Sequence, residues 1–138
     1  MEEWIQSGKK FHVVRDHMNH CFPMNGGMWG GVKGGIENIS SLILGWKAGH
    51  TQYMEDMKFL WAKVFPVAKH SLYQTDSYCC QRFEGTHPFP YQRLPNFEHV
   101  GQVFMEDNKP RYSDIDRFIR INESPSVCRK DPSWKTGR

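Results

Sequence analysis

The sequence predicts an α/β fold with a mixed short sheet of three or four strands and two main helices. Short runs of β-branched and aromatic residues are typical of strands, and two stretches with apolar residues three and four apart are typical of helices. Clusters of glycine and proline separate these segments. The chain has 138 residues, of which 38% are hydrophobic and 24% charged, which suits a single globular domain.

Helical signals occur at four places in the chain. A first helix is expected at Glu2–Ser7, with Gly8 as its stop, and a second at residues 36–47, closed by Gly49. A third is expected to begin at Thr51 and to end or bend at Pro66. A short helix is expected at residues 113–121. The uncapped start of the first helix predicts that this chain is a portion of a longer one.

Strand signals occur at residues 11–16, 72–78 and 99–104, and the proline-rich stretch 87–93 is expected to stay mostly irregular. The predicted organisation is a partial domain at residues 1–121 followed by an irregular tail at 122–138.

Residues 25–35 carry six glycines around Trp29, and we expect neither helix nor strand in this loop. Glycines let a ligand approach the main chain, and an indole ring can stack on a sugar or a base. Met28 and Trp29 therefore either line a binding site or turn back into the core. The loop follows a strand and the polar residues Asp16, His17 and His20, which is the layout of a ligand site at a sheet edge.

Two carboxylates of the third helix, Glu55 and Asp56, fall in its first turn. They either stabilise the helix dipole or face a ligand held by a neighbouring loop. Asp16, His17 and His20 either bind a metal ion, as in a metal-dependent hydrolase, or make local hydrogen bonds.

Charge and composition exclude several functions. The formal charge of +3 is spread along the chain, which argues against nucleic acid as a partner. No apolar run is long enough to span a membrane, and the first ten residues lack the features of a signal peptide, so the sequence taken literally is cytoplasmic. The glycine loop matches neither common nucleotide-binding motif.

The four cysteines lack zinc-site spacing and are either free thiols or joined in one or two disulfides. The triplets Asn38-Ile39-Ser40 and Asn122-Glu123-Ser124 match the N-glycosylation pattern, which matters only in a secreted protein.

Seven motifs occur in a characteristic order: W-I-x-S-G-K, F-H-V-V-R-D-H, G-G-M-W-G, Y-M-E-D-M-K-F-L, T-D-S-Y-C-C, H-P-F-P-Y-Q-R and H-V-G-Q-V-F. Taken together, they resemble the C-terminal half of a group of uncharacterised glycosyltransferase-like proteins of the GT-A type. The resemblance extends to about residue 120.

The resemblance implies transfer of a sugar from a nucleotide-sugar to an acceptor hydroxyl, with Mn²⁺ or Mg²⁺ as cofactor. It places Gly26, Gly27, Met28, Trp29 and Gly30 in the sugar and acceptor pocket, together with Asp16 and His17. It gives Asp56 the catalytic or acceptor-positioning role and Asp76 that of a metal ligand.

Three departures from the family pattern weaken the expectation of catalysis. Met57 stands where a polar residue is expected, Thr75 stands where a histidine is common, and no Asp-x-Asp motif precedes the first strand. Asp114 and Asp116 have the Asp-x-Asp spacing but lie near the other end of the chain. The cation site is therefore expected to be incomplete, and this chain inactive alone.

The missing nucleotide-binding half would leave surfaces uncovered, which predicts self-association. If the chain is part of a longer, membrane-anchored transferase, it is expected in the Golgi or secretory lumen. The alternative function is a non-catalytic carbohydrate-binding or interaction domain that uses Trp29.

Overall fold

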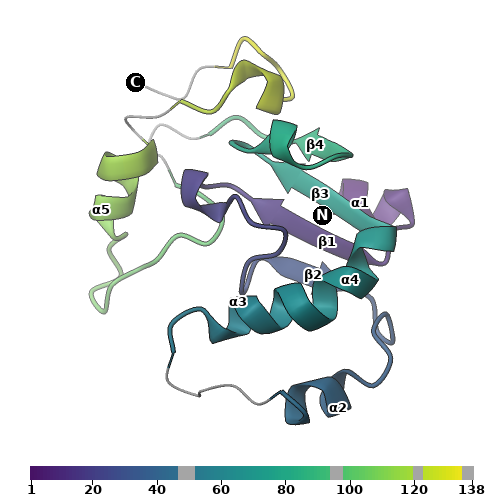
Figure 1. Ribbon diagram of the computed structural model, residues 1–138. Coiled ribbons are helices and arrows are strands. Elements are labelled where there is room, and N and C mark those ends of the chain that lie inside the picture. The colour runs from purple at the N-terminus through teal and green to yellow at the C-terminus, as the bar shows by residue number, and fades with distance from the viewer. Residues whose placement is uncertain (47–51, 94–97, 120–122, 135–138) are drawn as a thin grey trace. The chain divides into compact units, whose positions relative to one another are not determined.

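The computed structural model of the chain describes residues 1–46, 52–93, 98–119 and 123–134 and confirms the α/β class (Figure 1). Its sheet has four strands in the order β2-β1-β3-β4. They are β1 (Phe11–Arg15), β2 (Trp29–Gly31), β3 (Leu72–Asp76) and β4 (Thr86–Pro88). β2 is antiparallel to β1, whereas β4 is parallel to β3.

The chain forms two compact units, and each unit is built from two separate stretches of sequence. Unit 1 consists of residues 1–13 and 22–73, and unit 2 of residues 14–21 and 74–138. The strands β1 and β3 each begin in unit 1 and end in unit 2.

The glycine loop of unit 1 contains a strand that the sequence did not predict. Gly31 pairs with Phe11, and Gly30 with His12, in the β1–β2 ladder. A β-carbon on Gly31 would lie only 3.0 Å from the Phe11 ring. The expectation of an irregular loop was wrong here, because the missing side chain allows the two strands to pair around a large aromatic residue.

The helices of unit 1 follow the sequence prediction in part. The first, α1 (Glu2–Ser7), ends as expected at Gly8, which has a φ of 68°. The second, α2 (Ile39–Leu44), is shorter than predicted and is capped by Gly45. The predicted stop Gly49 and cap Thr51 lie outside the described residues.

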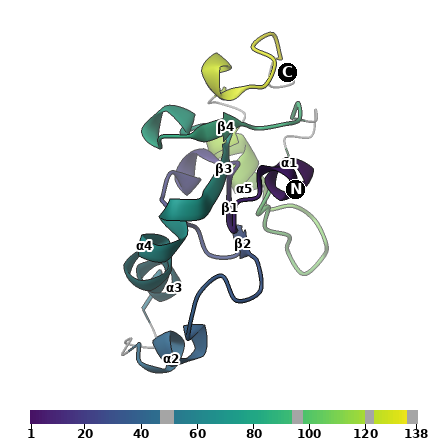
Figure 2. The same ribbon diagram turned by 90° about the vertical axis from the view of Figure 1, so that its right-hand side faces the viewer.

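The third helix continues through Pro66 instead of ending there. It comprises α3 (Glu55–Phe59), a π-helical turn (Leu60–Val64), α4 (Phe65–Ala68) and a final 3-10 turn (Lys69–Ser71). Proline lacks the backbone N–H that an α-helix interior needs. The wider turn directly before Pro66 changes the hydrogen-bond register, and the helical path from α3 to α4 is visible in Figure 2.

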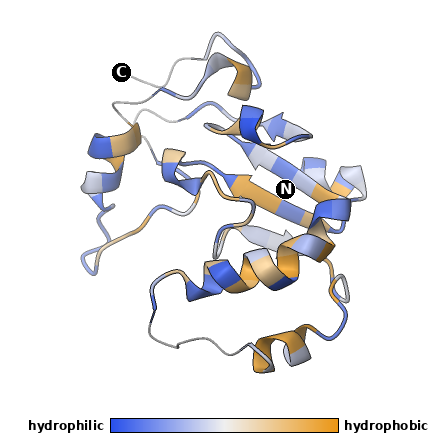
Figure 3. Cartoon of the chain, viewed as in Figure 1, coloured by the Kyte–Doolittle hydropathy of each residue, from blue (hydrophilic) through white to orange (hydrophobic). Residues whose placement is uncertain are grey.

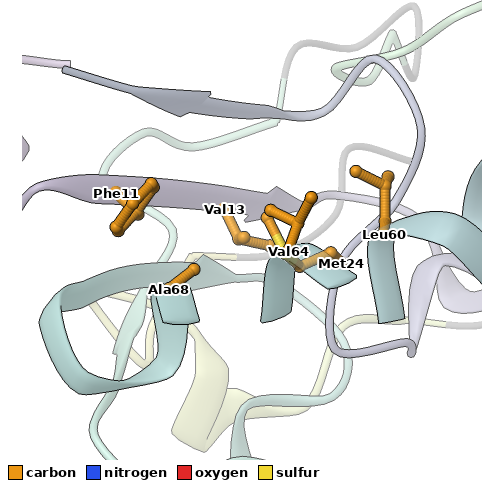
Figure 4. Close-up of a cluster of buried hydrophobic side chains, with 6 residues drawn as sticks. All are labelled: Phe11, Val13, Met24, Leu60, Val64 and Ala68. Atoms are coloured by element: carbon orange, nitrogen blue, oxygen red, sulfur yellow. The ribbon is translucent and has the colours of Figure 1, made fainter. Parts of the chain in front are cut away.

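The core of unit 1 packs the helical run against β1 (Figure 4). Its buried side chains come from β1, the following loop and one face of the helix: Phe11, Val13, Met24, Leu60, Val64 and Ala68. Figure 3 shows hydrophobic and hydrophilic patches following one another along this helical run. The buried residues Met57, Leu60 and Val64 stand three and four positions apart, which is the spacing of a helix with one buried face.

Unit 2 contains mostly short elements. Besides β4 they are three 3-10 turns (Met18–His20, Cys80–Arg82 and Ser126–Cys128), α5 (Tyr112–Asp114) and a π-helical turn (Ile115–Ile119). The predicted helix at 113–121 is confirmed as far as Ile119, and residues 120–122 lie outside the described part.

The strand predicted at residues 99–104 is wrong. His99 begins a turn closed by a hydrogen bond from the Gln102 N–H, and only Phe104 forms an isolated bridge, with Pro110. Val103 and Phe104 are exposed, so the β-branched and aromatic residues that suggested a strand do not pack on the sheet.

Two disulfides join distant parts of unit 2, Cys21 to Cys79 and Cys80 to Cys128. They resolve the alternatives left by the sequence in favour of paired cysteines. Cys128 is buried, so the segment predicted as an irregular tail is tied down at its 3-10 turn. Among the described residues, no helix has the length and apolar character needed to cross a membrane.

Candidate functional site

In unit 1 the glycine loop and the third helix meet at Gly26 and Asp56. A β-carbon on Gly26 would overlap the Oδ2 atom of Asp56 and lie 3.9 Å from the sulfur of Met57. Both Gly26 and Asp56 are exposed. The structure thus brings together two sequence motifs thirty residues apart and leaves a carboxylate lying on bare backbone at the surface.

Met57 holds this contact in place. Its side chain is buried, and its sulfur accepts a hydrogen bond of 3.0 Å from the Gly26 N–H. One turn further along, the Trp61 Nε1–H donates to the carbonyl of Met24 at 2.8 Å. Met57 therefore has a structural role, because its thioether fixes the loop beside Asp56.

The two large side chains of the loop turn inward. Met28 is buried, and Trp29 is half-buried and packs against the core cluster of unit 1. Gly30 lies in β2 beside the Trp4 ring. Of the five loop residues assigned to a pocket, Gly26 and Gly27 remain exposed, and Gly27 has a φ of 71° at the turn.

Asp16, assigned to substrate binding from the sequence, lies in unit 2 and is fully engaged with protein groups. Its Oδ1 accepts hydrogen bonds from Arg93 Nη2 at 2.6 Å and Ser77 Oγ at 2.5 Å, and its Oδ2 accepts one from the Val100 N–H at 3.0 Å. Burial raises the pKa of Asp16, although Arg93, Ser77 and Val100 each lower it. The carboxylate therefore joins the end of β1 to two later segments of the chain.

Asp76, assigned to metal binding, is also buried in unit 2. Its Oδ1 accepts the N–H groups of Tyr78 and Cys79, and its Oδ2 lies 3.7 Å from Arg15 Nη1. Arg15 donates to Gln74 and lies over the Phe83 ring, and burial lowers its pKa to about 10. Burial likewise raises the pKa of Asp76. Asp76 thus caps the turn after β3 and faces the buried guanidinium group of Arg15.

Three histidine rings gather in unit 2 beside Phe118. The ring centroid of His17 lies 5.0 Å from that of His20 and 4.8 Å from that of His99. Burial lowers the pKa of His20 and of His99 to about 4, and it also lowers the pKa of His17. The imidazoles are therefore neutral at physiological pH.

This cluster does not have the geometry of a metal centre. His17 Nδ1 accepts a hydrogen bond from the Asn19 N–H, which places the proton of the neutral ring on Nε2. A metal ion needs the lone pair of one ring nitrogen, but Nδ1 of His17 already accepts the Asn19 N–H and its Nε2 carries the proton. Within residues 1–46, 52–93, 98–119 and 123–134, no three His, Cys, Asp or Glu side chains are arranged to hold a metal ion.

Sequence reasoning did not single out Arg93, Ser77 or His99, the partners of Asp16 and His17. Each of them stands in one of the seven motifs, Ser77 in T-D-S-Y-C-C, Arg93 in H-P-F-P-Y-Q-R and His99 in H-V-G-Q-V-F, and that was the available signal. The pairing itself spans more than sixty residues and has no local pattern.

Comparison with known protein families finds no match for the chain, and neither curated proteins nor solved structures contain a significant one. The interpretation of both sites therefore depends on their residues and geometry and on the sequence motifs.

Proposed function

We propose that this chain is the sugar and acceptor side of a glycosyltransferase-like protein of the GT-A type, and that sugar hydroxyls bind at Gly26, Gly27 and Asp56. The observation that supports the proposal most directly is the exposed Asp56 carboxylate lying on the bare backbone of Gly26. A carboxylate accepts hydrogen bonds from vicinal hydroxyls, and glycines allow a sugar ring to approach the main chain.

Asp56 would act by orienting an acceptor hydroxyl and accepting its proton as the oxygen attacks the anomeric carbon of the nucleotide-sugar. The bond from that carbon to the phosphate oxygen would break, and the nucleoside diphosphate would leave. Met57 would act as a positioning residue by fixing the loop through the Gly26 N–H. The described residues do not fit the expected Mn²⁺ or Mg²⁺, because both Asp76 oxygens face protein donors and the side chain is buried.

Isothermal titration of the full chain with a panel of UDP- and GDP-sugars, with and without Mn²⁺, tests the proposal. We expect sugar-dependent binding that Asp56→Asn weakens at least tenfold. Glu55→Gln is the matched control, since it removes the neighbouring carboxylate, which pairs with Lys58 at 2.6 Å. Equal binding by Asp56→Asn and the wild type would reject the proposed site. A folded chain that binds neither nucleotide-sugars nor acceptor saccharides would also reject it.

The same titration, extended to free mono- and disaccharides, tests the alternative of a non-catalytic carbohydrate-binding domain. Binding of free sugars that ignores the nucleotide and disappears in Trp29→Phe would replace the transferase proposal. The packing of Trp29 against the core predicts that this substitution affects stability more than binding.

A further inference from the structure

The turn before α2 carries an exposed asparagine, Asn38, whose side chain does not cap the helix. Asn38 lies in a turn with a φ of 54°, a left-handed conformation that asparagine tolerates better than most residues. Its carbonyl accepts the Leu42 N–H at 3.0 Å, but its side chain makes no capping hydrogen bond to α2. The side-chain amide is therefore available without loss of a structural contact.

The residues around Asn38 direct it away from the core of unit 1. Ile36 and Ile39, on either side, are partly buried and pack against the core cluster. Glu37 and Ser40 are exposed, as is Asn38 itself. A large group on the Asn38 amide would thus point away from the core of unit 1 into solvent. The neighbouring isoleucines would keep their packing against that core.

The redox state of the chain supplies the second observation. Both disulfides described above, Cys21–Cys79 and Cys80–Cys128, leave no free cysteine. Protein disulfides persist in oxidising compartments such as the secretory lumen and are rare in the cytosol. The triplet Asn38-Ile39-Ser40 is the acceptor pattern read in that compartment.

We propose that Asn38 is an N-glycosylation site of this chain, modified in the secretory lumen. The co-substrate is an oligosaccharide linked through a diphosphate to a polyprenol lipid. The bond between the anomeric carbon and the phosphate oxygen breaks, a bond from that carbon to Asn38 Nδ2 forms, and the amide proton passes to a base of the host transferase. The lipid diphosphate leaves. This proposal does not depend on the sugar-transfer function.

Mass spectrometry of the protein purified from its own cells tests the site directly. Treatment with a peptide amidase in ¹⁸O-water converts a glycosylated Asn38 into ¹⁸O-labelled aspartate, and that labelled peptide is the expected result. An Asn38 peptide found only in its unmodified form would overturn the proposal. Four alkylatable thiols in the native, unreduced protein would also overturn it, since the compartment would then be reducing.

Variants of the full chain, directed into the secretory pathway of eukaryotic cells, give the second arm. We expect Asn38→Gln and Ser40→Ala to lose the same glycan on a gel, whereas Ser40→Thr keeps it because threonine also satisfies the pattern. Asn122→Gln separates the second triplet and should leave the Asn38 glycan in place. Retention of the glycan in Ser40→Ala, or its loss in Ser40→Thr, would contradict the assignment.

Discussion

The Oδ2 atom of Asp56 lies so close to the backbone of Gly26 that a β-carbon on residue 26 would overlap it. A single methyl group on the loop must therefore displace the carboxylate that the proposed function depends on. Because the displaced atom is the end of a flexible side chain, it can move aside, and the loss of folding free energy stays at about 1 kcal/mol.

This relationship predicts a coupled pair of substitutions. Gly26→Ala should lower the free energy of unfolding by about 1 kcal/mol and weaken sugar binding as much as Asp56→Asn does. In Asp56→Ala the added methyl has room, so the double variant should be less destabilised than the sum of the single variants. Urea unfolding of the four proteins measures the coupling, and strict additivity would show that the two residues do not touch.

The β1–β2 pair predicts that alanine substitutions at two adjacent glycines change stability by different amounts. Gly31→Ala should destabilise the protein by about 1 to 3 kcal/mol, because its β-carbon would meet the Phe11 ring at 3.0 Å. Gly30→Ala is the matched control, since its β-carbon would meet Trp4 at an ordinary 3.7 Å. Chemical denaturation compares the two, and similar losses would mean that the close approach to Phe11 is not the cause.

The buried contact between Asp16 and Arg93 predicts a large effect on stability. Asp16→Ala should cost about 3 to 5 kcal/mol, because it leaves the Arg93 guanidinium buried without its carboxylate. Adding Arg93→Leu should restore part of the loss. Asp107→Asn removes the exposed pair with Lys109 and should change stability little. If Asp16→Ala and Asp107→Asn unfolded at the same urea concentration, the buried contact between Asp16 and Arg93 would not stabilise unit 2.

The histidine cluster predicts that acid weakens the fold. The folded pKa of His99 is about 4 and the unfolded pKa is about 6.5, so between these values the unfolded chain binds more protons. Stability should therefore fall as the pH decreases through that window. Asp16 and Asp76, whose pKa values are raised by burial, act in the opposite sense.

A comparison of wild type with His99→Asn isolates this effect. The free energy of unfolding, measured in urea between about pH 7 and about pH 5, should decline less steeply in the variant. Parallel curves would show that His99 is not a buried neutral imidazole.

The disulfides predict a stability gain that does not depend on the proposed function. The Cys80–Cys128 bond closes a loop with a separation of 48 residues, for which chain entropy gives about 4 kcal/mol. Cys80→Ser combined with Cys128→Ser should lose about this much, and dithiothreitol should then lower the melting temperature of this variant less than that of the wild type. Unchanged melting in both comparisons would argue that the cysteines are not paired.

Local sequence signals predicted elements wherever local forces decide the structure. The end of α1 at Gly8 follows from glycine chemistry, and the position of β1 follows from its β-branched residues. The same reasoning missed β2, because the advantage of Gly31 appears only when Phe11 lies against it. It failed at residues 99–104 because β-branched and aromatic residues such as Val103 and Phe104 give the same signal when they are exposed as when they lie in a sheet.

The candidate site could be predicted only as separate motifs. Asp56 and the glycine loop were both identified, but the overlap with Gly26 and the hydrogen bond from its N–H to Met57 depend on tertiary packing. Asp16 was expected to face a ligand, and only its distance to Arg93 shows that it is engaged within the protein.

The discontinuous make-up of the two units sets an order for their completion during translation. Unit 1 has its last residue at Tyr73, so all of it has been synthesised before the larger part of unit 2 begins at Gln74. Asp16 meanwhile remains without Ser77 and Arg93, and Cys21 without Cys79. No single cut in the chain separates one unit from the other, so neither can be transferred to another protein as one continuous segment. A gene truncated after unit 1 would encode Asp16, directly after β1, without the Ser77, Arg93 and Val100 groups that bind it in the full chain.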